Sequence, residues 1–450
     1  MLTAKRPPPH LLEDFYYQYH NERYVGFYQF LLPTLIIRDL DLIKNITVKD
    51  FETFPEHRTF VTEDVDPLFG RSLFAMKGGS RWQTMRATLS PTFTSRKLKG
   101  MFEFMLDCAT QFTAHYEKQG ELVEVEMKQA FTMYTNDIIA STVFGVNCNS
   151  FQNPDNEFRQ MGREATDFSG IKNMKFMFHA IHPLLAKLLG KGIFSEKVSS
   201  FFRNLVQSAL KMREERNIVR HDVLHLLTEA RKQNEHNAIV TDDDITGNAL
   251  LFFTAGFDTS STMLSFTCHE LAVNPDVQHK LVREINDTFQ DSKISYELLL
   301  GMKYLEQVIS ESLRKWPPSM QTDRVCVRSY KLSETFTLEK GTNVWIPIFA
   351  LHRDPRYHLD PLKFDPERFN DENKRKMVPY TYMPFGVGPR SCIGSRFALL
   401  QAKIILVEML RAFEIVPVEK TQIPLQLSCH TFNPSAEKGF LLGLKRRKNL

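Results

Sequence analysis

Residues 384–402 read PFGVGPRSCIGSRFALLQA, and this stretch of sequence decides the fold class. Gly386 and Gly388, followed directly by a proline, predict a tight loop with exposed backbone N–H groups. Apolar residues at helical spacing begin after Gly394, so a helix should start there. Cys392 therefore lies just before the N-terminus of a predicted helix.

The position of Cys392 indicates a metal ligand. A helix N-terminus and a nearby guanidinium, here that of Arg390, both lower the pKa of a thiol and favour the thiolate. A thiolate surrounded by backbone donors is a good soft ligand for iron. An arbitrary cysteine is more often an inert buried side chain, but the loop before Cys392 and the helix after it favour the ligand. The other cysteines form no closely spaced pair, so we expect no disulfide framework and no zinc site: Cys108, Cys148, Cys268, Cys326 and Cys429.

The composition of the 450-residue chain is that of an ordinary globular protein, with 42% hydrophobic and 24% charged residues. Lys and Arg number 57 against 53 Asp and Glu, and a net charge of +4 is too small to indicate a nucleic-acid partner. The sequence contains no internal repeat and no long Gly/Ser linker, which favours one domain over residues 1–450. The 36 phenylalanines suit a large dry pocket as well as an ordinary core.

The longest predicted helix runs from about Thr241 to Val273. An acidic residue three positions after Thr241 is a helix-start signal, and an Asn-Pro pair ends the pattern. The helix is apolar on most faces, so it should cross the core. Residues 255–260, AGFDTS, interrupt the apolar run. Either the helix kinks there, with hydroxyls bonding back to the preceding turn, or it widens so that a ligand can lie against its backbone.

The remaining pattern is mostly helical from about residue 95 to 310. Short strands are predicted at 35–37, 330–338 and 343–348 and within 411–445. Residues 354–390 form a long irregular stretch rich in proline and charge, and loops of that length inside a domain are usually functional.

The pattern Phe385-x-x-Gly388-x-Arg390-x-Cys392-x-Gly394 resembles the haem-binding signature of the cytochrome P-450 family. Other marks of this family occur in the expected order along the chain: Trp82-x-x-x-Arg86, the segment 255–260, Glu311-x-x-Arg314 and the segment 366–369. The segments 89–94 and 350–355 are most similar to the clan that oxidises xenobiotics and steroids, and within it to the insect detoxification branch.

The resemblance implies a mainly α fold with a small β-rich lobe, holding haem b between the long central helix and the cysteine loop. Cys392 would be the proximal ligand of the iron, and thiolate ligation favours cleavage of the O–O bond. The implied reaction is a monooxygenation, in which one oxygen atom enters an apolar substrate and the other becomes water. A haem-thiolate isomerase or dehydratase and a non-catalytic haem-binding sensor are alternatives.

Four side chains are candidates to hold the haem propionates. Trp82 and Arg86 are four residues apart, hence on one helical face, and both are hydrogen-bond donors only, which suits a carboxylate. Taken alone, such a pair is more often a surface cation–aromatic contact. The resemblance adds Arg324 and Arg390, and the planar fork of arginine can grip a carboxylate with two hydrogen bonds.

Glu311 and Arg314 lie on the polar side of a predicted helix over 303–315. A solvated pair at this spacing would contribute only about 0.2–0.5 kcal/mol. The resemblance instead implies a buried triad with Arg368, which braces the core behind the cysteine loop.

Asp258 and Thr259 would form an acid–alcohol pair that delivers protons through water on the distal side of the haem. A structural role is also open for Thr259, whose hydroxyl could bond back to the carbonyl of Ala255. The presence of both residues argues against the isomerase alternative.

The sequence contains no GxGxxG dinucleotide motif, so the resemblance implies electrons from NADPH through a cytochrome P-450 reductase, with cytochrome b5 as a further candidate partner. No run reaches 18 apolar residues, and the family's N-terminal membrane anchor is absent from this sequence. Residues 171–194 mix lysines with large apolar residues, which fits either an interfacial amphipathic segment or a core-facing helix pair. We expect a peripheral protein on the cytosolic face of the endoplasmic reticulum membrane.

Overall fold

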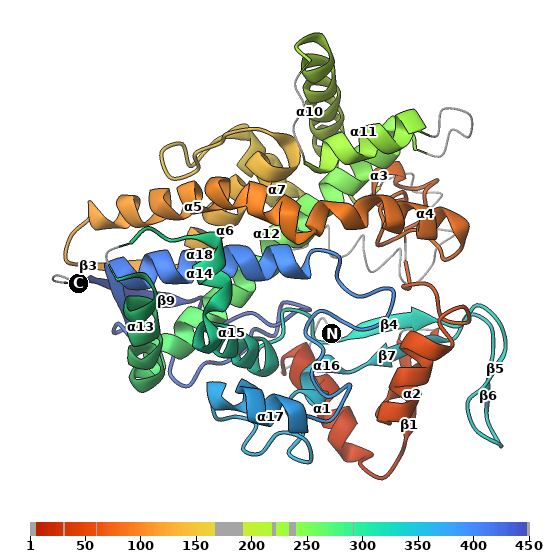
Figure 1. The fold of residues 1–450 in the computed structure, drawn as a ribbon. Coiled ribbons are helices and arrows are strands. Elements are labelled where there is room, and N and C mark those ends of the chain that lie inside the picture. The colour runs from red at the N-terminus through yellow and green to blue at the C-terminus, as the bar shows by residue number, and fades with distance from the viewer. Residues whose placement is uncertain are drawn as a thin grey trace.

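The computed structural model describes residues 6–29, 32–59, 61–166, 192–217, 222–233, 240–290 and 292–447. Helices dominate the described part, and three small sheets accompany them (Figure 1). The α-helices are α1 (Pro8–Gln18), α2 (Leu40–Lys44), α3 (Pro67–Gly70), α4 (Ser80–Leu89), α5 (Ser95–Glu117), α6 (Met127–Ile139), α7 (Glu157–Thr166), α10 (Glu196–Glu215), α11 (Val223–Gln233), α12 (Asp242–Val273), α13 (Pro275–Phe289), α14 (Tyr296–Gly301), α15 (Lys303–Lys315), α16 (Ile348–Leu351), α17 (Asp371–Lys376) and α18 (Ser395–Ala412). Short 3-10 or π turns extend or connect them: η1 (Asn45–Lys49), η2 (Ser90–Phe93), η3 (Ala140–Phe144) and η4 (Pro366–Phe369).

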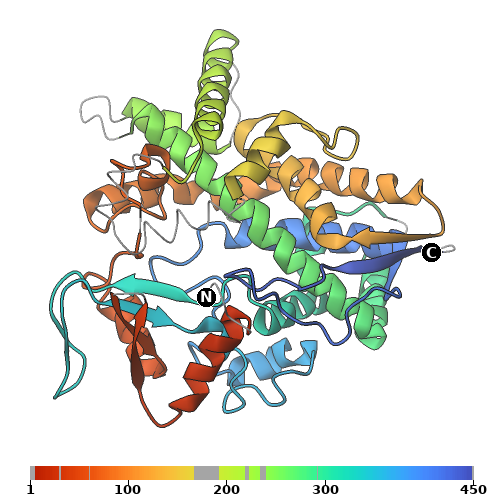
Figure 2. The ribbon, with the colours of Figure 1, turned by 180° about the vertical axis from the view of Figure 1, so that it is seen from behind.

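Helix α12 crosses the middle of the molecule, as the view from behind shows (Figure 2). Its start is fixed by a capping box, because the Thr241 hydroxyl accepts from the Asp244 amide while the Asp244 carboxylate accepts from the Thr241 amide. Most of its side chains from Ser260 onwards are buried, since α6, α15 and α18 pack around it. Side chains are thus buried on nearly every side of this part of the helix, as the apolar sequence predicts.

Within the described residues, the β-structure divides into three sheets. The largest has the order β1 (Tyr24–Gln29), β2 (Leu32–Ile37), β7 (Asn343–Ile346), β4 (Thr322–Val325), with β2 and β7 parallel and the other neighbours antiparallel. The second has the order β3 (Leu122–Glu126), β9 (Leu441–Arg446), β8 (Phe413–Val416), and the third pairs β5 (Tyr330–Lys331) with β6 (Thr337–Leu338). Because β7 pairs with β2, a strand that lies about 300 residues earlier in the sequence, two segments far apart in the chain lie side by side in this sheet (Figure 1).

In the part of the chain that the structure describes, three clusters of buried apolar residues form the core. One lies among α5, α12, α15 and α18, a second between the first half of α12 and helices α4, α7 and α10, and a third under the largest sheet. Phe252 of α12 and Ile393, the neighbour of Cys392, pack against both of the first two clusters. The cysteine loop therefore reaches the core where these two clusters meet.

The predicted mainly α fold with a small β-rich part is confirmed. Helix α15 has the predicted bounds, and α12 begins one residue later than expected. The helix remains continuous through residues 255–260. Helix α1 was not predicted from the sequence, and β3 interrupts the region predicted to be helical. The amphipathic prediction for residues 171–194 falls almost entirely outside the described residues.

Candidate functional site

The loop before Cys392 is a compact turn held by its own backbone. Gly386 donates its amide to the carbonyl of Met383 at 3.0 Å, and the Cys392 amide donates to the carbonyl of Phe385 at 2.8 Å. Gly388 has a φ of +75°, and a Cβ at this position would lie 2.0 Å from the carbonyl oxygen of Thr47. Only glycine satisfies both requirements. The loop leads directly into α18, so the thiol is presented at a helix N-terminus, as predicted.

The pKa of the Cys392 thiol differs from the expectation. Burial among surrounding atoms raises this pKa, while the Gly394 amide and the charge of Arg86 act in the opposite direction. The prediction of a lowered pKa is therefore wrong for the chain alone, because the sequence shows the helix and the arginines but not the desolvation. The cation that acts on the sulfur is Arg86 rather than Arg390. The thiol nevertheless remains exposed, unlike Cys108, Cys268 and Cys326, and all six cysteines are free.

The four predicted propionate ligands lie close together, with Trp82, Arg86 and Arg324 around Arg390. The guanidinium of Arg390 lies over the ring of Trp82, with its Cζ atom 4.1 Å from the ring centroid. Burial lowers the pKa of Arg390 to about 9, and repulsion from Arg324 and Arg86 contributes. Burial likewise lowers the pKa of Arg324 to about 10, with Asp323 acting against it. This cluster has an excess of buried positive charge, which an anionic group would stabilise.

Several donors in this cluster have no acceptor among the described residues. Trp82 Nε1 and Arg324 Nε are buried without a hydrogen-bond partner. The guanidinium of Arg86 makes no hydrogen bond or ion pair with a described residue. Arg390 differs, because its three nitrogens donate to the carbonyls of residues 55, 73 and 76 at 2.7–3.0 Å. Unpaired buried donors are rare in native structures, so their presence around Arg390 points to a ligand rich in acceptors.

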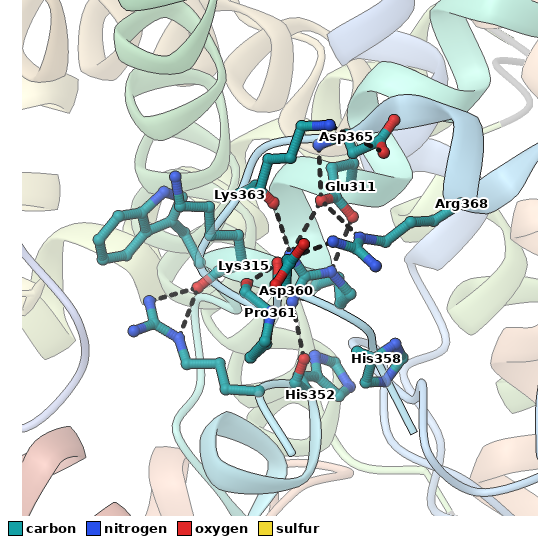
Figure 3. Close-up of polar contacts among 12 residues, drawn as sticks. Glu311, Lys315, His352, His358, Asp360, Pro361, Lys363, Asp365 and Arg368 are labelled. Carbon is teal, nitrogen blue, oxygen red and sulfur yellow. Dashed lines mark hydrogen bonds and ion pairs between the residues drawn. The ribbon is translucent and has the colours of Figure 1, made fainter. Parts of the chain in front are cut away.

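The triad of Glu311, Arg314 and Arg368 is present, as the resemblance implied. Arg314 donates from Nε and Nη2 to the two oxygens of Glu311 at 2.7 and 2.8 Å, and neither side chain is exposed to solvent. Arg368 Nε lies 3.3 Å from Glu311 Oε1, and the Asp365 amide donates to the same oxygen at 2.9 Å (Figure 3). Arg314 also donates to the carbonyls of His352 and Pro361. The irregular stretch 354–390 is thereby held against α15.

The middle of α12 carries Thr259 and Asp258 on different faces. Thr259 and Ala255 are exposed, although the helix is largely buried around them, and the Thr259 hydroxyl donates to the Ala255 carbonyl at 2.6 Å. The back-bond that the sequence left open is therefore formed. The Asp258 carboxylate instead points toward α6, where Lys128 Nζ lies 2.7 Å from Oδ1.

Sequence reasoning missed two side chains that support the site. Lys128 is the second residue of α6 and carries no local motif that would connect it to Asp258. His352 accepts the amide of Met383 on its Nε2 atom at 2.8 Å, directly before the cysteine loop. Both contacts join residues far apart in the chain, so only the folded structure brings them together.

The chain belongs to the cytochrome P450 family. The family model described as Cytochrome P450 matches residues 5–438. The chain is 44% identical to cytochrome P450 9e2 of Blattella germanica, over 97% of this chain and 88% of the relative. It is 41% identical to the probable cytochrome P450 9f2 of Drosophila melanogaster (99% and 91% covered) and 37% identical to cytochrome P450 6k1 of B. germanica (95% and 85% covered).

This membership makes the chain a haem-dependent monooxygenase and confirms the predicted insect branch. The residues present fit haem, because Trp82 and Arg324 leave buried donors unpaired beside the guanidinium of Arg390, and the propionates of haem are hydrogen-bond acceptors. An accessible thiol at the end of the loop suits the iron. Within the described residues, the structure shows no helix with the length and hydropathy needed to cross a membrane.

Proposed function

We propose that residues 1–450 form one haem-thiolate monooxygenase domain in which Cys392 is the iron ligand. The observation that carries this assignment is the placement of an exposed thiol on a loop fixed by the Phe385 carbonyl, at the N-terminus of α18. The nearby charge of Arg86 favours the thiolate, and ligation to a cation does so further. The family match over residues 5–438 supports a single domain.

Trp82, Arg86, Arg324 and Arg390 hold the propionates in this proposal. The first three supply donors that the described part of the protein leaves unpaired. Arg390 uses three of its five N–H groups on backbone carbonyls, so one hydrogen on each of Nη1 and Nη2 remains for a carboxylate. Its stacking on Trp82 positions both side chains together.

Asp258 and Thr259 move protons on the distal side in this proposal, while the bound haem supplies the oxygen chemistry. Thr259 Oγ1 donates its own hydrogen to Ala255, so its lone pairs remain free to accept from a water molecule. Asp258, half-exposed and paired with Lys128, can exchange protons with solvent. The two residues together would connect solvent near Asp258 to the exposed surface of α12 around Ala255 and Thr259.

The substrates in this proposal are lipophilic small molecules such as xenobiotics, insecticides or steroids. The exposed part of α12 near Ala255 is flanked by Leu251 and Phe252, which are only partly buried, so an apolar molecule would find apolar partners there. Electrons come from NADPH through cytochrome P-450 reductase, with cytochrome b5 as a second donor. The protein acts on the cytosolic face of the endoplasmic reticulum membrane as a peripheral protein.

The spectrum of the reduced carbon monoxide complex tests the central assignment. Cys392→Ala should abolish the strongly red-shifted Soret band that thiolate ligation produces. Single alanine variants of the other five cysteines are matched controls and should retain the band. A red-shifted band in the Cys392 variant would overturn the assignment.

A further inference from the structure

We propose that His352 is a positioning residue that connects the buried Glu311–Arg314–Arg368 triad to the cysteine loop, through a neutral imidazole whose Nε2 atom accepts the Met383 amide. This inference rests on the proposed role of Cys392 as the iron ligand and deepens it. It adds the mechanism by which an ion cluster on α15 fixes a thiol in a distant part of the chain.

The first half of the connection is a hydrogen bond from the triad to the backbone of His352. Arg314 Nη1 donates to the His352 carbonyl at 2.8 Å, while the same guanidinium holds Glu311. His352 itself caps α16, because its amide donates to the carbonyl of Ile348 at 2.9 Å. Figure 3 shows the carbonyl of His352 facing the ion cluster. The backbone of His352 is therefore fixed on both sides.

The second half is made by the imidazole. Nε2 accepts the amide of Met383 at 2.8 Å, and the ring is completely buried. The Met383 carbonyl in turn accepts from Gly386, the first glycine of the loop. Since the Cys392 amide closes the same loop on the carbonyl of Phe385, a series of short backbone contacts leads from His352 to the thiol.

Only one form of the imidazole can make this contact. A backbone amide is a donor, so Nε2 must carry its lone pair and the single ring hydrogen must be on Nδ1. The Nδ1 atom is buried without a hydrogen-bond partner among the described residues, so the contact with Met383 is the hydrogen bond that orients the ring. Burial holds the pKa of His352 well below its usual range, and the charges of His358 and Arg314 act in the same direction. The neutral form is thus the one that the surroundings select.

A matched pair of amide substitutions separates this role from a packing role. The carboxamide oxygen of glutamine ends as many bonds from Cβ as Nε2 does, so His352→Gln keeps an acceptor for Met383. The oxygen of asparagine ends one bond earlier, at the position of Nδ1, so His352→Asn loses that acceptor at similar polarity. His269→Leu serves as a control, because His269 is a buried histidine of α12 whose ring makes no hydrogen bond with a described residue.

Two readouts are measured on the holoenzyme. The first is the fraction of the reduced carbon monoxide complex that shows the red-shifted band, and the second is hydrogen exchange of the peptide that contains Met383. We expect His352→Gln and His269→Leu to resemble the parent protein. His352→Asn should lose most of the red-shifted fraction and exchange the Met383 amide about tenfold faster.

The outcomes distinguish the two proposals. If His352→Asn keeps both the band and the protection of Met383, the inference is overturned while the role of Cys392 stands. If the parent protein shows no red-shifted band but the exchange difference appears, the ligand assignment fails and the loop-positioning role of His352 stands. If His352→Gln is as defective as His352→Asn, the ring acts by packing and not by accepting the Met383 amide.

Discussion

Lys128 Nζ lies 2.7 Å from Asp258 Oδ1 and 2.8 Å from the backbone carbonyl of the same residue, which ties the start of α6 to the middle of α12. The ammonium also reaches the hydroxyls of Ser261 and Thr262 at 2.8 and 2.6 Å. Burial lowers the pKa of Lys128, whereas the carboxylate of Asp258 acts to keep the charge. The acid proposed to relay protons therefore has a fixed orientation before any substrate binds.

Replacement of Lys128 should uncouple the reaction more than it weakens substrate binding. In Lys128→Met the Asp258 carboxylate loses its partner and its orientation, so proton delivery becomes disordered. The surface of α12 around Ala255 and Thr259 is unchanged. We expect less product per NADPH consumed, more peroxide, and an unaltered spectral dissociation constant for substrate. Lys128→Arg keeps the charge and should recover most of the coupling. Equal coupling in Lys128→Met and the parent enzyme would show that the ion pair does not organise the relay.

Thr259 has a structural bond and a proposed chemical role, and substitutions separate them. Thr259→Ala removes both the bond to Ala255 and the hydroxyl, whereas Thr259→Ser can keep both. We expect Thr259→Ala to bind haem, substrate and carbon monoxide normally but to release peroxide, with product formation reduced by up to about 10²–10⁴-fold and less where water substitutes. Thr259→Ser should retain coupling. Unchanged product-to-NADPH ratios in Thr259→Ala and in Asp258→Asn would refute the acid–alcohol role.

The triad predicts an order of stability losses. Arg314→Leu leaves Glu311 charged in a fully buried site and should cost about 3–5 kcal/mol in the free energy of unfolding. Arg368→Leu should cost less, because its contact with Glu311 is longer and its side chain is partly exposed. Lys376→Ala, which removes an exposed pair with Glu372, is the control and should change stability by less than about 0.5 kcal/mol. Denaturant titrations of the three variants test this order.

Two glycines of the cysteine loop share a positive φ but differ in their surroundings. Gly388 faces the carbonyl of Thr47, whereas a Cβ on Gly386 would have only an ordinary contact, 3.8 Å from Ser391. Alanine at either position carries the backbone strain, roughly 1–2 kcal/mol. Only Gly388→Ala also requires the backbone to move, so we expect it to lose most bound haem while Gly386→Ala keeps a measurable fraction. Haem content per polypeptide in the purified variants measures the difference, and equal losses would contradict the proposed clash.

The sequence predicted most of what is local in this fold. The apolar stripe of α15 gave its bounds, and three of the four buried positions of α1 (Pro8, Leu12 and Tyr16) follow a four-residue period that could have revealed that helix. The cysteine loop was also predictable, because its glycines and its helix are adjacent in the chain. Lys128 and His352 were not, since each acts on a residue that only the packing of distant elements brings near. The predicted lowering of the pKa of Cys392 was wrong for the same reason, because burial is a property of the folded surroundings.

The loss of folding stability at low pH should arise partly from His358. This residue belongs to the stretch 354–390, which also contacts the triad. Its Nε2 atom donates to the Thr381 carbonyl at 3.1 Å, and burial lowers its pKa from 6.5 to about 4. Between these two values the unfolded chain binds a proton that the folded protein excludes, so stability is unaffected above the upper value and falls as the pH decreases through the window. This one group should contribute about 2 kcal/mol of lost stability between pH 7.5 and 5. His358→Gln can keep a donor for Thr381 without titrating, so its free energy of unfolding should depend less on pH by that amount. Identical pH profiles for the parent protein and His358→Gln would show that this histidine does not titrate between the folded and unfolded states as its burial requires.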